Sequence, residues 1–250
     1  MIRLVTFDAL HTIIRPRLPV YVQYSQTFAP YLGTLDPDRL KQSFKAALKE
    51  LQTSKPLYES GAEGWWGEVI KRTALGAGAN SKAVDASLPE IVPRLMKRFS
   101  SSEGYALFAD TLSTIQNLRE ENITTGVITN ADMRIVSVME SLSLGHLLDP
   151  VLVSEQEGVE KPAKDIFLRA CARAEVRPHE ALHVGDELDA DFHGATKAGL
   201  HALLLRRSGP EGEEARKEPE EDLEGVVVVE SLYEVVQWVK QHGGAQPPPL

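Results

Sequence analysis

The feature that most constrains the fold of this chain is a series of short apolar runs, set among polar turns and stretches of helical periodicity. Six runs are predicted as strands, at residues 4–7, 125–129, 151–154, 182–185, 201–205 and 226–229. Helices are predicted at residues 110–121, 134–144, 164–174, 191–198 and 231–241. Because the strand runs are continuously apolar rather than alternating, they are typical of strands covered on both faces. The pattern predicts an α/β fold with a doubly wound, Rossmann-like parallel sheet.

Residues 17–100 interrupt this alternation, because they contain helical patterns and no strand signal. The helical patterns lie at residues 21–31, 38–51, 63–74 and 87–99. A chain of 250 residues, 42% of them hydrophobic, is long enough for one core and a smaller second domain. We therefore expect a discontinuous α/β core of residues 1–16 and 101–242, and an inserted α-helical cap domain of residues 17–100. Residues 208–224 are expected to form an acidic loop, and residues 243–250 a flexible tail.

The net charge of −9 is concentrated in the acidic loop, which carries −6 and leaves −3 for the other 233 residues. No basic stripe remains for a phosphate backbone, so nucleic acid is not an expected partner. A solvated loop is the simplest interpretation of residues 208–224, and binding of a protein partner is the alternative.

The expected location is intracellular and soluble, without distinction between cytoplasm and nucleus. No apolar run approaches the length of about 18 residues that a membrane span needs. The first five residues leave no room for a signal peptide before the first strand. Cys171 is the only cysteine, which excludes an intrachain disulfide and a cysteine-based zinc site.

Polar residues follow the predicted strands at the points where ligands gather in a parallel sheet. The segments are Asp8–Thr12 after the first strand, Thr129-Asn130 at the end of the second, Lys161 before a proline, and Gly185-Asp186 with Asp191 after the fourth. A single such residue is ordinarily a turn former or a solvated side chain. Four groups at successive strand ends, in this order, point instead to one site on one rim of the sheet.

These four segments resemble the motifs of the haloacid dehalogenase superfamily of hydrolases, and the match covers nearly the whole chain. The motif residues are DALHT from Asp8, Thr129 in GVITN, Lys161 in EKP, and Gly185-Asp186 with Asp191. The insertion between the first two motifs resembles the helical-cap class of the family. Within the family, the pair Trp65-Trp66 in the cap is most similar to a eukaryotic subgroup, although both rings are expected chiefly to fill the cap core.

The resemblance implies a Mg²⁺ site made of oxygen donors. Its expected ligands are Asp8, the main-chain carbonyl of Leu10, Asp186 and Asp191. Asp191 is expected either to coordinate the ion directly or to support the groups that do. Hard oxygen donors of this kind suit Mg²⁺. Glu187 and Asp189 are expected to be exposed loop acids.

The resemblance also implies phosphoryl transfer, with Asp8, Lys161 and Thr129 as catalytic residues. Asp8 would be the nucleophile and form an aspartyl phosphate. Thr129, the backbone amide of Asn130 and Lys161 would bind the phosphoryl group. The implied substrate is a small phosphorylated metabolite.

Leu10 departs from the family pattern, because the phosphatases of the family carry a second aspartate there as general acid and base. Loss of such a group typically costs about 10²- to 10⁴-fold in rate. Three hypotheses remain open: a slow Mg²⁺-dependent phosphatase, a non-catalytic protein that binds a phosphate-bearing ligand or partner, and a dehalogenase. The acids Asp186 and Asp191 count against the last. His11 is expected to point away from the Leu10 side chain, provided that the local chain is extended.

Overall fold

A computed structural model describes residues 1–55, 58, 61–212 and 221–242 and divides the chain into two compact units. Unit 1 comprises Met1–Arg15, Leu107–Ile135 and Ser143–Leu250. Unit 2 comprises Pro16–Ala106 and Val136–Leu142. The expected flexible tail, and residues 213–220 of the expected acidic loop, lie outside the described residues. None of the described helices is long and apolar enough to cross a membrane.

Unit 1 is built on a six-stranded sheet in the order β5-β4-β1-β6-β7-β8, with every pair of neighbours parallel. The strands are β1 (Leu4–Phe7), β4 (Thr124–Thr129), β5 (Val151–Val153), β6 (Ala181–Gly185), β7 (His201–Leu205) and β8 (Val228–Val229). The expected parallel sheet and all six of its strands are thus confirmed. Because β1 lies in the middle, its carboxyl end is flanked by those of β4 and β6.

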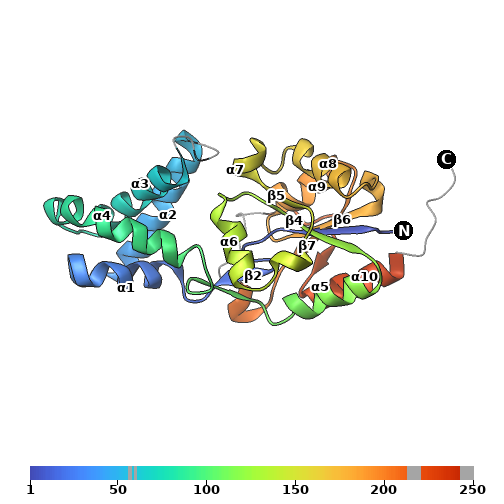
Figure 1. The fold of residues 1–250 in the computed structure, drawn as a ribbon, viewed down its shortest axis with the longest axis horizontal. Coiled ribbons are helices and arrows are strands. Elements are labelled where there is room, and N and C mark those ends of the chain that lie inside the picture. The colour runs from blue at the N-terminus through green and yellow to red at the C-terminus, as the bar shows by residue number, and fades with distance from the viewer. Residues whose placement is uncertain (56–57, 59–60, 213–220, 243–250) are drawn as a thin grey trace. The chain divides into compact units, whose positions relative to one another are not determined.

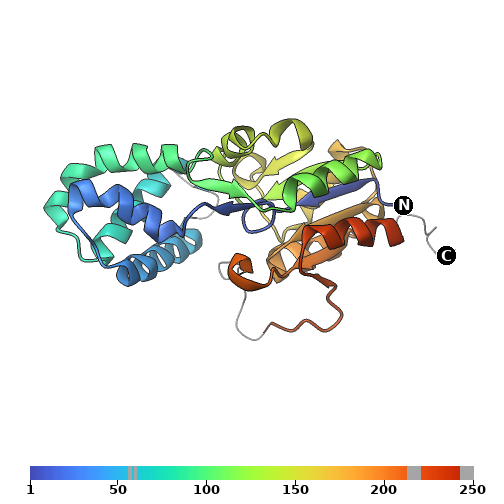
Figure 2. The ribbon, with the colours of Figure 1, turned by 90° about the horizontal axis from the view of Figure 1, so that it is seen from below.

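Helices cover both faces of the sheet, as the continuous apolar strands require (Figure 1). The helices α5 (Thr111–Glu120) and α10 (Leu232–His242) pack side by side on one face, and α8 (Lys164–Arg173) and α9 (Gly194–Lys197) lie on the other (Figures 1 and 2). Short helical segments complete the unit: α7 (Ser154–Glu157), η2 (Gly145–Leu147), η3 (Pro178–Glu180), η4 (Leu188–His193) and η5 (Gly209–Gly212). The helix α6 (Arg134–Ser141) is divided between the two units.

The core between the sheet and α8 is apolar and closely packed. Leu4, Ile128 and Leu152 from three neighbouring strands meet Ile166 and Phe167 of α8, and all five side chains are fully buried. Burial of each such side chain contributes about 1.5–3 kcal/mol, which fixes the sheet against the helix. Cys171 of α8 belongs to the same cluster, and burial raises the pKa of its thiol to about 11.

Unit 2 is dominated by four helices, α1 (Val20–Leu32), α2 (Pro37–Ser54), α3 (Ala62–Gly76) and α4 (Ser81–Arg98). Tyr24 of α1 meets Phe28 and Phe44 in edge-to-face contacts at the centre of their cluster. A second cluster contains Trp65, which is buried, and the partly buried Trp66. The expectation that both tryptophans help to fill the core of the helical region is therefore confirmed.

Several elements differ from the sequence expectations. The helix α4 begins at Ser81 rather than at 87, because Asn80 caps it by accepting a hydrogen bond from the Ala83 amide and its first turns are polar. Two short strands were not predicted, β2 (Ile14–Pro16) and β3 (Tyr105–Leu107), which pair as a separate two-stranded sheet. The helix expected at 191–198 begins earlier, as the π-helical turn η4, and continues as α9.

Candidate active site

The carboxyl ends of the central strands β4, β1 and β6 lie side by side at one edge of the sheet in unit 1. Phe7 of β1 is in register with Val127 of β4 and with Val184 of β6. Asp8 therefore lies beside the strand ends that carry Thr129 and Asp186. All three residues are buried, although Asp8 and Asp186 are carboxylates. A cluster of buried acids needs compensating charge or hydrogen bonds.

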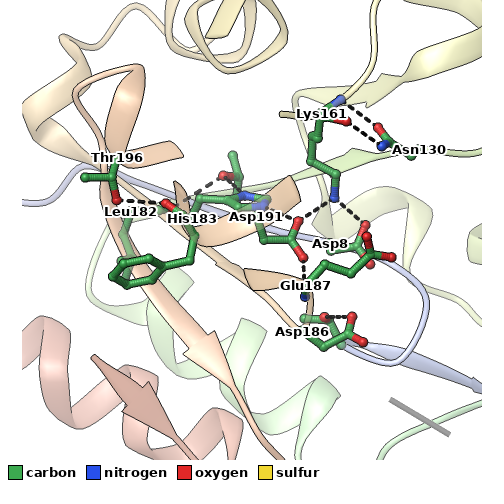
Figure 3. A network of polar contacts seen from close by, with 12 residues as sticks. Asp8, Asn130, Lys161, Leu182, His183, Asp186, Glu187, Asp191 and Thr196 are labelled. Carbon is green, nitrogen blue, oxygen red and sulfur yellow. Dashed lines mark hydrogen bonds and ion pairs between the residues drawn. The ribbon is translucent and has the colours of Figure 1, made fainter. Parts of the chain in front are cut away.

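Lys161 supplies that compensation (Figure 3). Its Nζ donates to Oδ1 of Asp8 and to Oδ1 of Asp191, both at 2.6 Å. The lysine is only 4% exposed, which excludes the interpretation that it is an ordinary solvated residue beside a proline. One ammonium group thus bridges the carboxylates from two of the four motifs.

The side chain of Asn130 holds the backbone of Lys161 in place. Asn130 Nδ2 donates to the carbonyl of Lys161 at 2.9 Å, and Asn130 Oδ1 accepts from its amide at 2.8 Å. The asparagine was expected from sequence to bind phosphate through its backbone amide, and that role stays a prediction. These two side-chain contacts give Asn130 a further role, which is to fix the position of the Lys161 backbone from which the lysine side chain extends.

Asp191 is surrounded by donors on both of its carboxylate oxygens. Oδ1 accepts from Lys161 and contacts His183 Nε2 at 3.0 Å, and Oδ2 accepts from the Glu187 amide at 2.9 Å. The carboxylate also occupies the space beside Gly185, where an added Cβ would lie 2.1 Å from Asp191 Cγ. Only glycine at the end of β6 permits this approach.

The pKa shifts in the cluster arise because the Lys161 ammonium group contacts the carboxylates of both Asp8 and Asp191. Burial raises the pKa of Asp8, and Lys161 opposes that shift. Burial would likewise raise the pKa of Asp191, but Lys161 and His183 together hold it well below its usual range. Burial disfavours the charge of Lys161, but Asp191 and Asp8 outweigh this effect and raise the lysine pKa.

Three acids form the one group of potential metal ligands within the described residues. Asp8, Asp186 and Asp191 each offer an oxygen, and these atoms lie within 4.8 Å of one another. Thr12 Oγ1 donates to Asp186 Oδ1 at 3.4 Å, which helps to orient that carboxylate. Three carboxylates and one ammonium leave two negative charges, and oxygen donors of this kind match a divalent cation such as Mg²⁺.

The loop after Asp8 differs from the extended chain assumed above. His11 has a φ of +64°, in the left-handed region, and its amide donates to the carbonyl of Ile14. The premise for the direction of the His11 side chain was therefore wrong, because the chain turns at that residue. Leu10 and His11 are both half-buried. Asp189 is exposed as expected, whereas Glu187 is half-buried.

Two residues of the network were missed by the sequence reasoning, His183 and Thr6. Both are fully buried in neighbouring strands, and they are register partners in the β1–β6 pair. The available signal was a histidine and a threonine inside strands that are otherwise apolar. A polar side chain in a strand covered on both faces requires a partner, which neither strand reveals by itself.

The family is decided by comparison with known proteins. A family model described as haloacid dehalogenase-like hydrolase matches residues 2–199. The chain belongs to the haloacid dehalogenase-like hydrolases. This hydrolase is 31% identical to the haloacid dehalogenase-like hydrolase domain-containing protein 3 of Bos taurus, over 84% of this chain and 83% of that protein. The eukaryotic subgroup that the pair Trp65-Trp66 indicated is that of the proteins with this name.

Solved structures agree with the fold of this hydrolase. A dehalogenase superposes with a TM-score of 0.69 at 19% identity, over 95% of this chain and 96% of that one. The HAD-hydrolase YfnB of Bacillus subtilis, solved bound to magnesium, superposes with a TM-score of 0.67 at 19% identity, over 96% and 99% of the two chains. At these identities the likeness concerns the fold, and the chemistry must be argued from the site itself.

Proposed function

We propose that this hydrolase is a Mg²⁺-dependent phosphatase that acts on small phosphate monoesters through an aspartyl phosphate on Asp8. The observation that carries the proposal is the Lys161 ammonium, which lies 2.6 Å from Asp8 Oδ1 at the carboxyl end of the central strand. In that position it lowers the repulsion between the attacking carboxylate and an anionic phosphate. Asp8 forms a bond to phosphorus while the bond to the leaving oxygen breaks, and water then cleaves the acyl phosphate.

The remaining roles follow from position. Thr129 ends β4 beside β1, where its hydroxyl is proposed to donate to a phosphoryl oxygen together with the Asn130 amide. Asp8, Asp186 and the Leu10 carbonyl are the proposed Mg²⁺ ligands, and the bound ion would neutralise charge on the phosphoryl group. Asp191 is proposed to act chiefly by holding Lys161, because three donors already occupy its carboxylate.

The retained acids favour phosphate chemistry over dehalogenation. Asp186 is 2% exposed and lies in the group with Asp8 and Asp191. Without a cation, this excess of negative charge would repel the carboxylate of a haloacid. Dehalogenation is therefore not the function proposed for this chain.

Leu10 sets the expected limit on the rate. Leucine cannot protonate a leaving group, so the alkoxide of an alkyl phosphate must leave without receiving a proton from residue 10. We expect turnover to be fastest on aryl phosphates, whose leaving groups are stable as anions. The same residue is the observation that favours a second candidate function, a protein that binds phosphate ligands without turning them over.

Hydrolysis of p-nitrophenyl phosphate tests the proposal. We expect Mg²⁺-dependent turnover by the wild type, loss of turnover in Asp8→Asn and on chelation, and retention in the control Asp165→Asn, which removes an exposed charge. Leu10→Asp should raise hydrolysis of an alkyl phosphate more than that of the aryl ester. If wild type and Asp8→Asn are equally inactive but inorganic phosphate still binds, the binding function replaces the catalytic one.

A further inference from the structure

His183 is a fully buried residue in the middle of β6, and both of its ring nitrogens have partners. Its Nδ1 is 2.9 Å from Thr6 Oγ1, and its Nε2 is 3.0 Å from Asp191 Oδ1. The ring is fully buried and meets the edge of Phe167, with ring centroids 5.1 Å apart. Figure 3 shows the imidazole on the opposite side of Asp191 from Lys161.

The partners of His183 define its proton positions. An ionised carboxylate only accepts hydrogen bonds, so the proton facing Asp191 must be on Nε2. The Thr6 hydroxyl carries one proton, and His183 Nδ1 at 2.9 Å is its nearer acceptor. The Thr6 hydroxyl therefore donates to Nδ1, in preference to the Leu182 carbonyl at 3.4 Å. The neutral ring with its proton on Nε2 therefore fits both contacts of the imidazole.

The contacts form a continuous chain from the sheet interior to Asp8. Thr6 donates to His183, His183 donates to Asp191, and Lys161 donates to both Asp191 and Asp8. Oδ1 of Asp191 is shared, because it accepts from both His183 and Lys161. If the imidazole donor is removed, Oδ1 of Asp191 is held only by Lys161, and the carboxylate can turn about its contact with the Glu187 amide and draw the ammonium group away from Asp8.

We propose that His183 is a positioning residue, which holds the Asp191 carboxylate in the orientation that keeps the Lys161 ammonium on Asp8. The inference rests on the proposed function in so far as reaction occurs at Asp8. Outer contacts of this kind are commonly worth about 10- to 100-fold in activity when they are removed. A histidine that merely fills the core would instead be replaceable by any ring of the same size.

Three substitutions separate these two roles. His183→Phe keeps the ring volume and the contact with Phe167 but removes both hydrogen bonds. His183→Asn places its amide near the position of Nδ1, so it keeps the contact with Thr6 and loses Asp191. His183→Gln places an N–H near the position of Nε2, so it keeps the donor to Asp191.

With p-nitrophenyl phosphate, we expect kcat to fall about 10- to 100-fold in the Phe and Asn variants, with KM changed much less. The Gln variant should recover most of kcat. Thermal unfolding of all three variants provides the control for folding. Equal loss of kcat in Gln and Asn, or retention of kcat in Phe, overturns the proposal in favour of a core-filling role.

Nitrogen-15 NMR tests the inference without turnover. In the wild type, the His183 signal, identified by its absence from the Gln variant, should report the neutral ring with its proton on Nε2. The Lys161 ammonium signal should shift in Asn and stay close to its wild-type position in Gln. If the wild type hydrolyses nothing, the proposed function fails, and these two signals still decide the inference. A proton on Nδ1, or a Lys161 signal that ignores the Asn substitution, overturns it.

Discussion

At the scale of single residues, Gly185 shows how closely the site is built against the sheet. The strand β6 ends at this residue, and the Asp191 carboxylate occupies the space that a Cβ would fill. An alanine there would overlap Asp191 Cγ, so either the strand end or the carboxylate must move. Because Lys161 donates to both Asp191 and Asp8, such a movement would also displace the lysine from the proposed nucleophile.

We expect Gly185→Ala to destabilise the protein by about 1–3 kcal/mol through overpacking and to reduce turnover strongly. Urea unfolding and the rate on p-nitrophenyl phosphate measure the two effects. Gly67→Ala in α3 is the matched control, because its added Cβ meets only Val92 at 3.9 Å. That substitution should stabilise the helix by up to about 1 kcal/mol. Similar behaviour of the two variants would contradict the packing argument.

Asn130 makes a second residue-scale prediction. In Asn130→Asp the side chain keeps its shape, but an oxygen replaces the Nδ2 donor that faces the Lys161 carbonyl. We expect stability to fall by about 1 kcal/mol and kcat to fall as Lys161 shifts from Asp8. Both asparagines are exposed, and Asn122→Asp makes the same chemical change before the start of β4, so it serves as the control. An unaltered kcat in Asn130→Asp would show that the hydrogen bond from Asn130 Nδ2 to the Lys161 carbonyl, one half of the clamp of Asn130 on the Lys161 backbone, is dispensable.

At the scale of elements, one buried ion pair joins four parts of unit 1. Asp110, just before α5, accepts two hydrogen bonds from Arg207 after β7 and one from the Leu232 amide at the start of α10. Arg207 also donates to the Thr12 carbonyl at 3.0 Å and lies over the Phe108 ring. The pair therefore ties the loop that follows Asp8 to the helices on one face of the sheet.

We expect Asp110→Ala to cost about 3–5 kcal/mol, because it leaves the buried guanidinium of Arg207 uncompensated. The double variant Asp110→Ala/Arg207→Met should lose much less stability than the sum of the losses in the two single variants. Urea unfolding of the four proteins of this double-mutant cycle measures the coupling. Additive losses would mean that the two side chains act independently.

Glu180 gives an element-scale prediction about pH. Hydrogen bonds from the side chain and the amide of Arg177 lower its pKa from 4.5 to about 2. The unfolded chain then binds more protons than the folded chain between these values, so the contribution to stability is lost as the pH falls through that range. Glu180→Gln should show a shallower loss in the same window, measured by urea unfolding at a series of pH values. Parallel stability profiles would contradict this expectation.

At the scale of the whole molecule, the proposed Mg²⁺ ligands all belong to unit 1. Binding to the folded state alone stabilises by about 2.7 kcal/mol at a hundredfold excess over Kd. We expect Mg²⁺ to raise the unfolding temperature of the wild type in calorimetry and to leave Asp186→Asn unmoved. If the two units unfold separately, the transition of unit 1 is the one that shifts. An equal shift in both proteins would place the ion elsewhere.

The sequence was sufficient for the sheet and for which residues approach its rim. Apolar runs such as 201–205 are long enough to specify strands, and parallel strands present Asp8, Thr129 and Asp186 at one edge. The sequence was insufficient for contacts between side chains that are far apart along the chain. The clamp of Asn130 on Lys161, and the contact of His183 with Asp191, depend on orientations that only packing determines. The turn at His11 was missed because a left-handed histidine has no distinctive sequence signal.

Cys171 has a practical consequence for observing this molecule at work. Its thiol is the only one in the chain, is buried in α8, and has a pKa near 11, so little thiolate is available to an alkylating dye. Cysteines introduced at two exposed positions, Glu120 in unit 1 and Lys82 in unit 2, should therefore react selectively without removal of the native residue. Energy transfer between two such fluorophores would follow the separation of the units in real time as phosphate or Mg²⁺ is added.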